Sequence, residues 1–236
     1  MDKLLDKLPK SQIKKFYRFD PKSAVASISH PGVSLTGIKH GLPKGDANKK
    51  PFIVVFRHGI SEDNTARLFS GWRDSTKLTK EGEDQAKALY GPLKNIDFDY
   101  FFQSDQVRSQ HTLELAMGDR NYTPITDWRI KERNHGDLNG TSKSDLMEKD
   151  TLRAILYRRS WDYPPPRGES LEMVFSRVGA FIKELKYVLL KENASAVISC
   201  SNNSMRPIRA YFDKLTIDEA MKLENPTGKD YCLYNL

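Results

Sequence analysis

The sequence has no long apolar segment and few cysteines. No hydrophobic run approaches the ~18 residues that a membrane-spanning helix needs, and the mean hydropathy is −0.62. The two cysteines, Cys200 and Cys232, are too few for a disulfide framework. Both lie in apolar stretches, so we expect free, buried thiols in a reducing compartment. The N-terminus lacks the apolar core of a secretory signal. These absences predict a cytoplasmic protein that does not bind membranes.

The body of the chain also lacks an excess of charge of either sign. The net charge is +7, but residues 1–50 carry 11 Lys and Arg against 4 Asp and Glu, and residues 51–236 carry 27 of each sign. A nucleic-acid-binding fold needs a basic stripe on its own surface, so we expect no nucleic-acid partner. Residues 1–50 show no persistent hydrophobic period. We expect them to form a basic, loosely ordered extension of a domain that spans residues 51–236.

The domain is predicted to alternate strands and helices. Apolar runs predict strands at 52–56, 99–104, 124–128, 195–200 and 230–235. Helical patterns occupy 79–90, 105–117, 142–159, 169–192, 204–214 and 216–223. This alternation predicts an α/β fold, a three-layer αβα sandwich with a mainly parallel sheet and helices on both faces. Trp72, Trp128 and Trp161 are expected to pack in its core.

Polar motifs follow three of the predicted strands, where the active sites of such sheets lie. These are RHG at 57–59, SDQVR at 104–108 and SNNSMR at 201–206. A neutral imidazole is a good nucleophile toward phosphorus, and a guanidinium can hold phosphate oxygens through two parallel hydrogen bonds. Taken alone, however, His58 at a strand end is more often a structural hydrogen-bonding residue. The wider sequence context reverses that interpretation.

Several further motifs continue the pattern in a fixed order along the chain. They are RHGISEDN at 57–64, FSGWRDSTKLTKEG at 69–82, Ser104 with Arg108, WRIKERNHG at 128–136, Lys143, RRSWDYPPP at 158–166, GESL at 168–171, NSMR at 203–206 and NPTG at 225–228. This series resembles the 2,3-bisphosphoglycerate-dependent phosphoglycerate mutase family of the histidine phosphatase superfamily. The resemblance covers residues 52–236, so it identifies the domain as a phosphoglycerate mutase-like catalytic domain.

The resemblance implies a glycolytic and gluconeogenic isomerase that interconverts 3-phosphoglycerate and 2-phosphoglycerate. It implies 2,3-bisphosphoglycerate as the phosphoryl primer, no metal, and a monomer or homodimer whose partner is a small phosphorylated substrate. His58 would carry the phosphoryl group, and Glu132 would act as general acid and base. Arg57 and Arg108 would hold the transferring phosphoryl. The rest of the substrate would be held by Asn64, Ser70, Gly71, Arg133, His135, Lys143, Arg158, Arg159, Asn202 and Asn203.

One strand end departs from the family pattern. Where the family reads Ala-His-Gly-Asn-Ser-Leu-Arg, this chain reads Cys-Ser-Asn-Asn-Ser-Met-Arg at 200–206. Ser201 therefore takes the place of the second catalytic His, which donates to the phosphoryl in the transition state. Loss of one such donor costs about 10²–10³ in rate. Ser201 stays in the predicted catalytic set as an uncharged donor with a shorter reach.

This departure leaves three interpretations open. The first is a phosphoglycerate mutase of reduced activity. The second is a phosphate monoester phosphatase of the same superfamily, because a short lid between Pro166 and Gly168 and the absence of a long tail after Leu236 would admit water and favour hydrolysis. The third is a catalytically weak homologue that binds a phosphorylated ligand or a protein partner.

Overall fold

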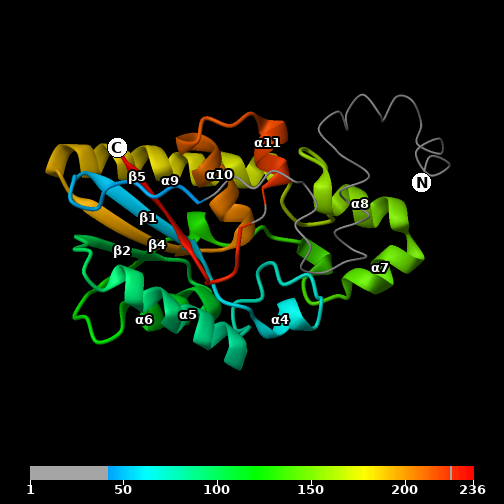
Figure 1. The fold of residues 1–236 in the computed structure, drawn as a ribbon. Helices are drawn as coiled ribbons and strands as arrows, with labels where there is room; N and C mark the ends of the chain where they lie inside the picture. Colours follow the sequence, from blue (N-terminus) through cyan, green and yellow to red (C-terminus); the bar gives the residue numbers. More distant parts are fainter. Residues whose placement is uncertain (1–41, 224) are drawn as a thin grey trace.

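A five-stranded sheet forms the centre of the molecule (Figure 1). The computed structural model describes residues 42–223 and 225–236, without the side chains of Arg159 and Lys222. The strands are β1 (Phe52–Arg57), β2 (Tyr100–Gln103), β3 (Pro124–Thr126), β4 (Ser195–Cys200) and β5 (Tyr231–Asn235). Their order is β3-β2-β4-β1-β5. All neighbours are parallel except β1 and β5, which are antiparallel. The mainly parallel sheet is therefore confirmed.

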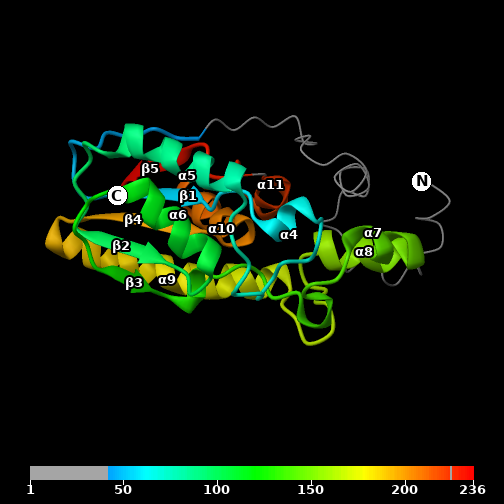
Figure 2. The same ribbon diagram turned by 90° about the horizontal axis from the view of Figure 1, so that it is seen from below.

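Helices cover both faces of this sheet (Figures 1 and 2). One face carries α5 (Lys80–Leu93) and α6 (Val107–Met117). The other carries α9 (Leu171–Glu192) and α10 (Asn202–Phe212), and α11 (Ile217–Lys222) packs on α10. The predicted three-layer sandwich is thus present.

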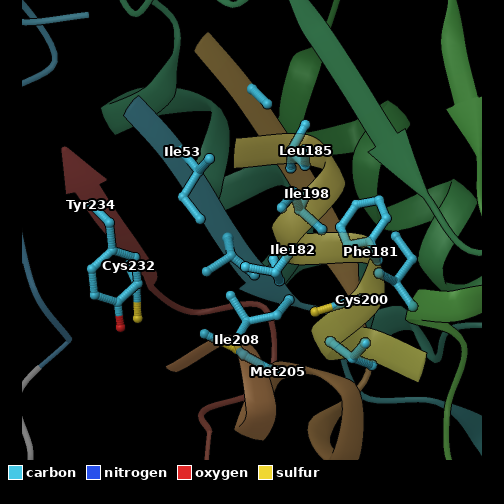
Figure 3. Close-up of a cluster of buried hydrophobic side chains, with 14 of the residues drawn as sticks. Ile53, Phe181, Ile182, Leu185, Ile198, Cys200, Met205, Ile208, Cys232 and Tyr234 are labelled. Atoms are coloured by element: carbon cyan, nitrogen blue, oxygen red, sulfur yellow. The ribbon is translucent and has the colours of Figure 1, made fainter. Parts of the chain in front are cut away.

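The apolar sequence of β1 from Phe52 to Phe56 follows from its burial on both faces. Ile53 and Val55 join the cluster under α9 and α10, of which Figure 3 shows a part. Phe52, Val54 and Phe56 join the cluster under α5 and α6. Because successive strand residues point to opposite faces, a strand buried on both sides has no place for a polar side chain.

The predicted helix at 142–159 is wrong as a single element. It divides into α7 (Lys143–Lys149) and α8 (Thr151–Arg159) at Asp150. Asp150 ends α7, and its Oδ1 accepts a hydrogen bond of 3.0 Å from the Arg153 backbone as the N-cap of α8. Three short elements were not predicted: α4 (Glu62–Thr65) and the 3₁₀ helices η2 (Trp128–Ile130) and η3 (Gly136–Leu138).

The tryptophans are also less buried than expected. Trp128 is 55% exposed, so the prediction of core packing is wrong for this residue. Trp72 is half-buried, and its indole Nε1 donates to the Glu132 carbonyl at 2.8 Å. Its role is to hold a loop of the candidate site.

Residues 42–50, which the sequence assigned to the extension, lie along the outer edge of β5. Gly45 N donates to Leu233 O at 3.0 Å, and Leu233 N donates to Pro43 O at 2.7 Å. Asn235 Nδ2 donates to the carbonyls of Asp46 and Lys49. This part of the extension thus packs on the domain, whereas the loose order predicted for residues 1–41 falls outside the described residues.

No helix in the described part of the chain is long and apolar enough to cross a membrane.

Candidate active site

The ends of three parallel strands lie side by side. Arg57 of β1 pairs with Cys200 of β4, and Gln103 of β2 pairs with Ser199 of β4. His58, Ser104 and Ser201 therefore leave the sheet at the same edge. The polar motifs of the sequence converge there, as expected for such a sheet.

A cleft of about 190 Å³ opens beside this edge. Its lining residues are Arg57, Asn64, Phe69, Ser70, Gly71, Glu132, Arg133, His135, Lys143, Arg158, Asn202, Asn203 and Arg206. Phe69 and Arg206 were not assigned to the site from the sequence, although Arg206 belongs to the NSMR motif. Of the other predicted residues, His58, Arg108 and Ser201 are buried and are not part of the lining. The side chain of Arg159 lies outside the described residues.

The described lining is strongly cationic. It contains five cations, four of them arginines, and Glu132 as its one carboxylate. Charges of one sign in a cleft with low-dielectric walls concentrate ligands of the opposite sign. The arrangement suits a small, multiply charged anion, with one carboxylate available to exchange a proton.

The His58 ring is held as a neutral imidazole. It is 3% exposed, and burial together with the charges of Arg108 and Arg57 holds its pKa well below the usual 6.5. Its Nδ1 lies 2.7 Å from the Gly59 carbonyl oxygen. Since a carbonyl oxygen only accepts, Nδ1 carries the proton, and Nε2 of the neutral ring keeps its lone pair. This tautomer leaves Nε2 as a nucleophile.

The glycine after His58 has a packing reason. A Cβ on Gly59 would lie 2.2 Å from the Gly82 carbonyl oxygen of α5, and a Cβ on Gly82 would meet Ile60 O at 2.0 Å. The loop that carries His58 therefore lies directly against the start of α5. This contact restrains the position of His58 against the sheet edge.

Two arginines flank His58, and each is oriented by backbone carbonyls. Arg108 is fully buried and donates to Gly71 O at 2.9 Å and to Arg73 O at 2.8 Å. Arg57 donates through Nη1 to Asn225 O at 2.8 Å. Both guanidiniums are thus held by neutral acceptors. Their charge is not cancelled by these contacts and can act on an anion at His58.

Asn225 of the NPTG motif connects several parts of the site. Its backbone carbonyl accepts from Arg57, and its side-chain Nδ2 donates to Asn202 Oδ1 at 3.0 Å. Its Oδ1 accepts from the buried Arg209 at 3.0 Å. The loop before β5 therefore joins the start of α10 to the arginine beside His58.

The loop that carries Glu132 rests on a buried ion pair. Glu169 and Arg177 contact each other at 2.7 Å, and Arg177 Nη2 also donates to Glu132 O at 3.0 Å. Arg133 Nε donates to Glu169 O at 2.7 Å. These contacts fix the Glu132 backbone and direct Arg133 into the cleft.

Burial and mutual repulsion shift the titration of the cleft cations. The pKa of Lys143 falls from 10.5 to about 8 through burial and the charges of Arg158 and Arg57. Burial lowers the pKa of Arg133 to about 10. The pKa of His135 lies well below 6.5 through burial and the nearby cations, so its ring is neutral. Arg133 Nη2 and His135 Nδ1 are buried atoms that have no hydrogen-bond partner among the described residues.

Ser201 lies at the N-terminus of α10 and is fully buried. Its backbone N donates to Ser204 Oγ at 3.1 Å, and its own Oγ lies 3.4 Å from Gln106 Oε1. Gln106 was not singled out from the sequence. Its position in SDQVR, directly beside Ser104 and Arg108, was the available signal.

The described residues include no group of three or more His, Cys, Asp or Glu side chains that could hold a metal ion. Cys200 and Cys232 are free and buried, as predicted.

Comparisons with known proteins agree with this geometry. The profile of the histidine phosphatase superfamily, branch 1, matches residues 53–233. A protein of Methanococcus vannielii named 2,3-bisphosphoglycerate-dependent phosphoglycerate mutase is 33% identical over 215 residues, 78% of this chain and 90% of its own. A protein of Sinorhizobium fredii with the same name is 37% identical over 184 residues, 75% of this chain and 86% of its own.

Solved structures share the fold at lower identity. The α-ribazole phosphatase of Shigella flexneri superposes with a TM-score of 0.68 at 24% identity, over 79% of this chain and 96% of its own. A mycobacterial glucosyl-3-phosphoglycerate phosphatase in complex with VO3 superposes with a TM-score of 0.68 at 22% identity. The match covers 77% of this chain and 91% of that protein. At these identities the likeness concerns the fold.

Proposed function

Because the chain belongs to the histidine phosphatase superfamily, branch 1, we propose that it is a phosphoglycerate mutase. It interconverts 3-phosphoglycerate and 2-phosphoglycerate through a phosphohistidine on His58. Ser201 makes its turnover slower than that of enzymes with a second catalytic His. The observation that carries this proposal is a neutral His58, whose Nε2 keeps its lone pair, at the sheet edge beside a cleft lined by five cations and one carboxylate.

The chemistry follows from the His58 tautomer. With a phosphoryl group on His58, Glu132 takes the proton from the free hydroxyl of the bound phosphoglycerate. That oxygen attacks the phosphorus, a P–O bond forms and the N–P bond to His58 breaks, which gives a bisphosphorylated intermediate. Nε2 of His58 then attacks the other phosphorus, the N–P bond forms, and the P–O bond breaks as Glu132 returns its proton to the leaving oxygen.

The cations divide between the transferring group and the rest of the substrate. Arg57 and Arg108, whose charges act on His58, face the phosphoryl group. Arg133, Lys143 and Arg158 also line the cleft and would hold the carboxylate and the remaining hydroxyl of a phosphoglycerate. Asn64, Ser70, Gly71, His135, Asn202 and Asn203 supply neutral hydrogen-bonding groups around it.

The same lining fits 2,3-bisphosphoglycerate as the primer. This molecule carries two phosphates and a carboxylate, and the cleft lining offers five cations to these anionic groups. When bound, the primer supplies the phosphoryl group that loads His58. The residues that would hold it are the cleft cations and Ser70.

The test is a metal-free assay of 3-phosphoglycerate conversion to 2-phosphoglycerate, with and without 2,3-bisphosphoglycerate. The proposal predicts slow conversion that the primer stimulates. The proposal is contradicted if 3-phosphoglycerate is converted equally well without the primer. It is also contradicted if no conversion occurs even when the primer is present.

A second candidate is hydrolysis of a phosphate monoester, and Ser201 favours it. Without a second catalytic His, transfer to an acceptor hydroxyl loses a preorganised donor, and water can take the phosphoryl from His58. The two solved relatives above are named as phosphatases. Release of inorganic phosphate in place of 2-phosphoglycerate would select this function. Tight binding of vanadate with neither product would select a ligand-binding homologue.

For the other properties the structure offers partial support. Free, buried thiols suit a reducing compartment, so we propose a cytoplasmic enzyme whose partner is its small phosphorylated substrate. A monomer or homodimer remains our expectation.

A further inference from the structure

Gln106 is a buried carboxamide at the junction of three segments of the site. It is fully buried at the residue before α6. Its Nε2 donates to Gly71 O at 2.8 Å, and its Oε1 accepts from Glu132 N at 3.0 Å. The third contact is Ser201 Oγ, 3.4 Å from Oε1. One side chain therefore connects the SGW loop, the Glu132 loop and the start of α10.

Each polar atom of this carboxamide has one near partner and one more distant partner. Oε1 has two lone pairs and accepts from Glu132 N at 3.0 Å and, over a longer 3.4 Å, from Ser201 Oγ. Nε2 has two hydrogens, which face Gly71 O and, at 3.5 Å, Asp74 Oδ1. The assignment of oxygen and nitrogen is not arbitrary, because the Glu132 N–H requires an acceptor and the Gly71 carbonyl requires a donor.

This arrangement determines where the Ser201 proton goes. The carboxamide oxygen can only accept, so Ser201 Oγ must be the donor of this pair. A hydroxyl has one hydrogen, and this 3.4 Å contact directs it toward Gln106.

We propose that Gln106 is a positioning residue that holds Glu132 in place and binds the Ser201 hydroxyl, so that Ser201 does not donate to the transferring phosphoryl group. Ser201 and Gln106 form a matched pair: the serine stabilises the carboxamide, and the carboxamide fixes the backbone beside the general acid and base. The strand end that lacks the second His thus serves to orient Glu132. This inference rests on the proposed function and assigns a role within it.

Two substitutions separate this role from direct donation. Ser201→Ala removes the hydroxyl but leaves the contact between Gln106 Oε1 and Glu132 N, so kcat should fall several-fold less than in Gln106→Met. Gln106→Met keeps length and volume but removes both polar atoms, so kcat should fall about tenfold or more while KM changes less. The pH dependence of kcat should also shift, because the Glu132 backbone loses its anchor.

The matched control is Gln103→Met. Gln103 is also a buried glutamine, but its Nε2 donates to Thr126 Oγ1, away from the cleft. It should leave kcat and its pH profile unchanged. Gln106→Glu retains an acceptor for Glu132 N and should recover part of the kcat lost in Gln106→Met. A fall of about 10²-fold in Ser201→Ala with no effect of Gln106→Met on kcat would overturn the proposal.

A double-mutant cycle on stability tests the Ser201–Gln106 pair independently of whether the protein has mutase activity. Urea unfolding midpoints are measured for the wild type, Ser201→Ala, Gln106→Met and the double variant. If the two side chains interact, the unfolding midpoint of the double variant should be lowered by less than the sum of the changes in the two single variants. Strict additivity would overturn the pairing even in a chain without mutase activity. An inactive wild type with non-additive midpoints would instead refute the proposed function and keep the pair.

Discussion

His58 and Ser201 follow neighbouring parallel strands at the same edge of the sheet, yet their hydrogen bonds have opposite consequences. The Gly59 carbonyl oxygen accepts a hydrogen bond from Nδ1 of His58, so the lone pair of the neutral ring is on Nε2. The Ser201 hydroxyl lies 3.4 Å from Gln106 Oε1, and we propose that this contact directs its proton away from the cleft. Equivalent positions on a sheet therefore do not imply equivalent chemistry.

The two regions also differ in what surrounds them. His58 lies beside the buried Arg108 and the half-buried Arg57, and burial together with these two charges lowers the pKa of its ring, which keeps it neutral. Ser201 caps α10 and faces a carboxamide. We infer that the His58 region serves phosphoryl chemistry and that the Ser201 region fixes the loops around it.

The largest effect is expected at His58. Replacing His58 by Ala removes the nucleophile, and turnover should fall by about 10³-fold or more. The measurement is the rate of 3-phosphoglycerate conversion. His111→Gln, on α6 and outside the cleft lining, is the matched control and should retain full activity. Equal activity of the two variants would show that His58 is structural.

A gain of activity is expected when the Ser201 region is rebuilt. Ser201→His combined with Gln106→Met supplies an imidazole donor and removes the carboxamide that would capture its proton. Turnover should rise about tenfold or more over Gln106→Met alone. Asn202 must be kept, because its Oδ1 holds Asn225 and through it Arg57. If Ser201→His performs equally well with Gln106 present, the carboxamide does not control this position.

Loss of Asn225 should weaken the His58 region. Asn225→Ala removes the side-chain contacts to Asn202 and Arg209, so the loop whose carbonyl orients Arg57 becomes less restrained. We expect kcat/KM to fall about tenfold, the loss of roughly one hydrogen bond to a charged group. Asn95→Ala, at an exposed position, is the control. An unchanged kcat/KM would mean that Arg57 does not depend on this loop.

A smaller effect concerns pH. Lys143 has a pKa of about 8, so it is charged below that pH and loses its proton above it. Affinity for vanadate should therefore decline about three- to tenfold as the pH rises from 7 to 9, because one cation of the anion site is lost. Lys143→Arg keeps its charge over this range and should flatten the profile. If vanadate affinity of the wild type depends on pH as little as that of Lys143→Arg, then Lys143 is not the cation whose charge is lost in this range.

The smallest effect is expected from the extension. Residues 42–50 pair with β5, which neighbours β1 on the side away from β4. Deleting residues 1–41 should change Tm by no more than a few degrees, whereas deleting 1–50 should lower it further, since the pairing with β5 is lost. Thermal unfolding of both truncations decides this. A collapse of the shorter deletion would show that residues 1–41 also pack on the domain.

Much of the fold could be predicted because its signals are local. Strand β1 is apolar from Phe52 to Phe56 since both faces are buried there, and it was placed within one residue of its observed end. The division of 142–159 at Asp150 was missed because a capping aspartate inside a helical pattern looks like an ordinary polar residue. The exposure of Trp128 depends on a tertiary position that composition does not reveal.

The candidate site divides in the same way. Motif residues such as Arg57 and Glu132 line the cleft together, as their positions after strands suggested. Gln106 could not be identified, because its role depends on contacts 26 and 95 residues away in sequence. Side chains that hold the reactive groups leave no spacing pattern, and only the folded chain brings them to their partners.

The central claim is that His58 carries the phosphoryl group, and trapping that group tests it most directly. The full chain is incubated with 2,3-bisphosphoglycerate, quenched in alkali and digested, and the modified residue is identified by mass spectrometry. Our account predicts an acid-labile phosphoryl group on His58, absent from His58→Ala. A chain that takes up no phosphoryl group, or takes it up equally in His58→Ala, would contradict it.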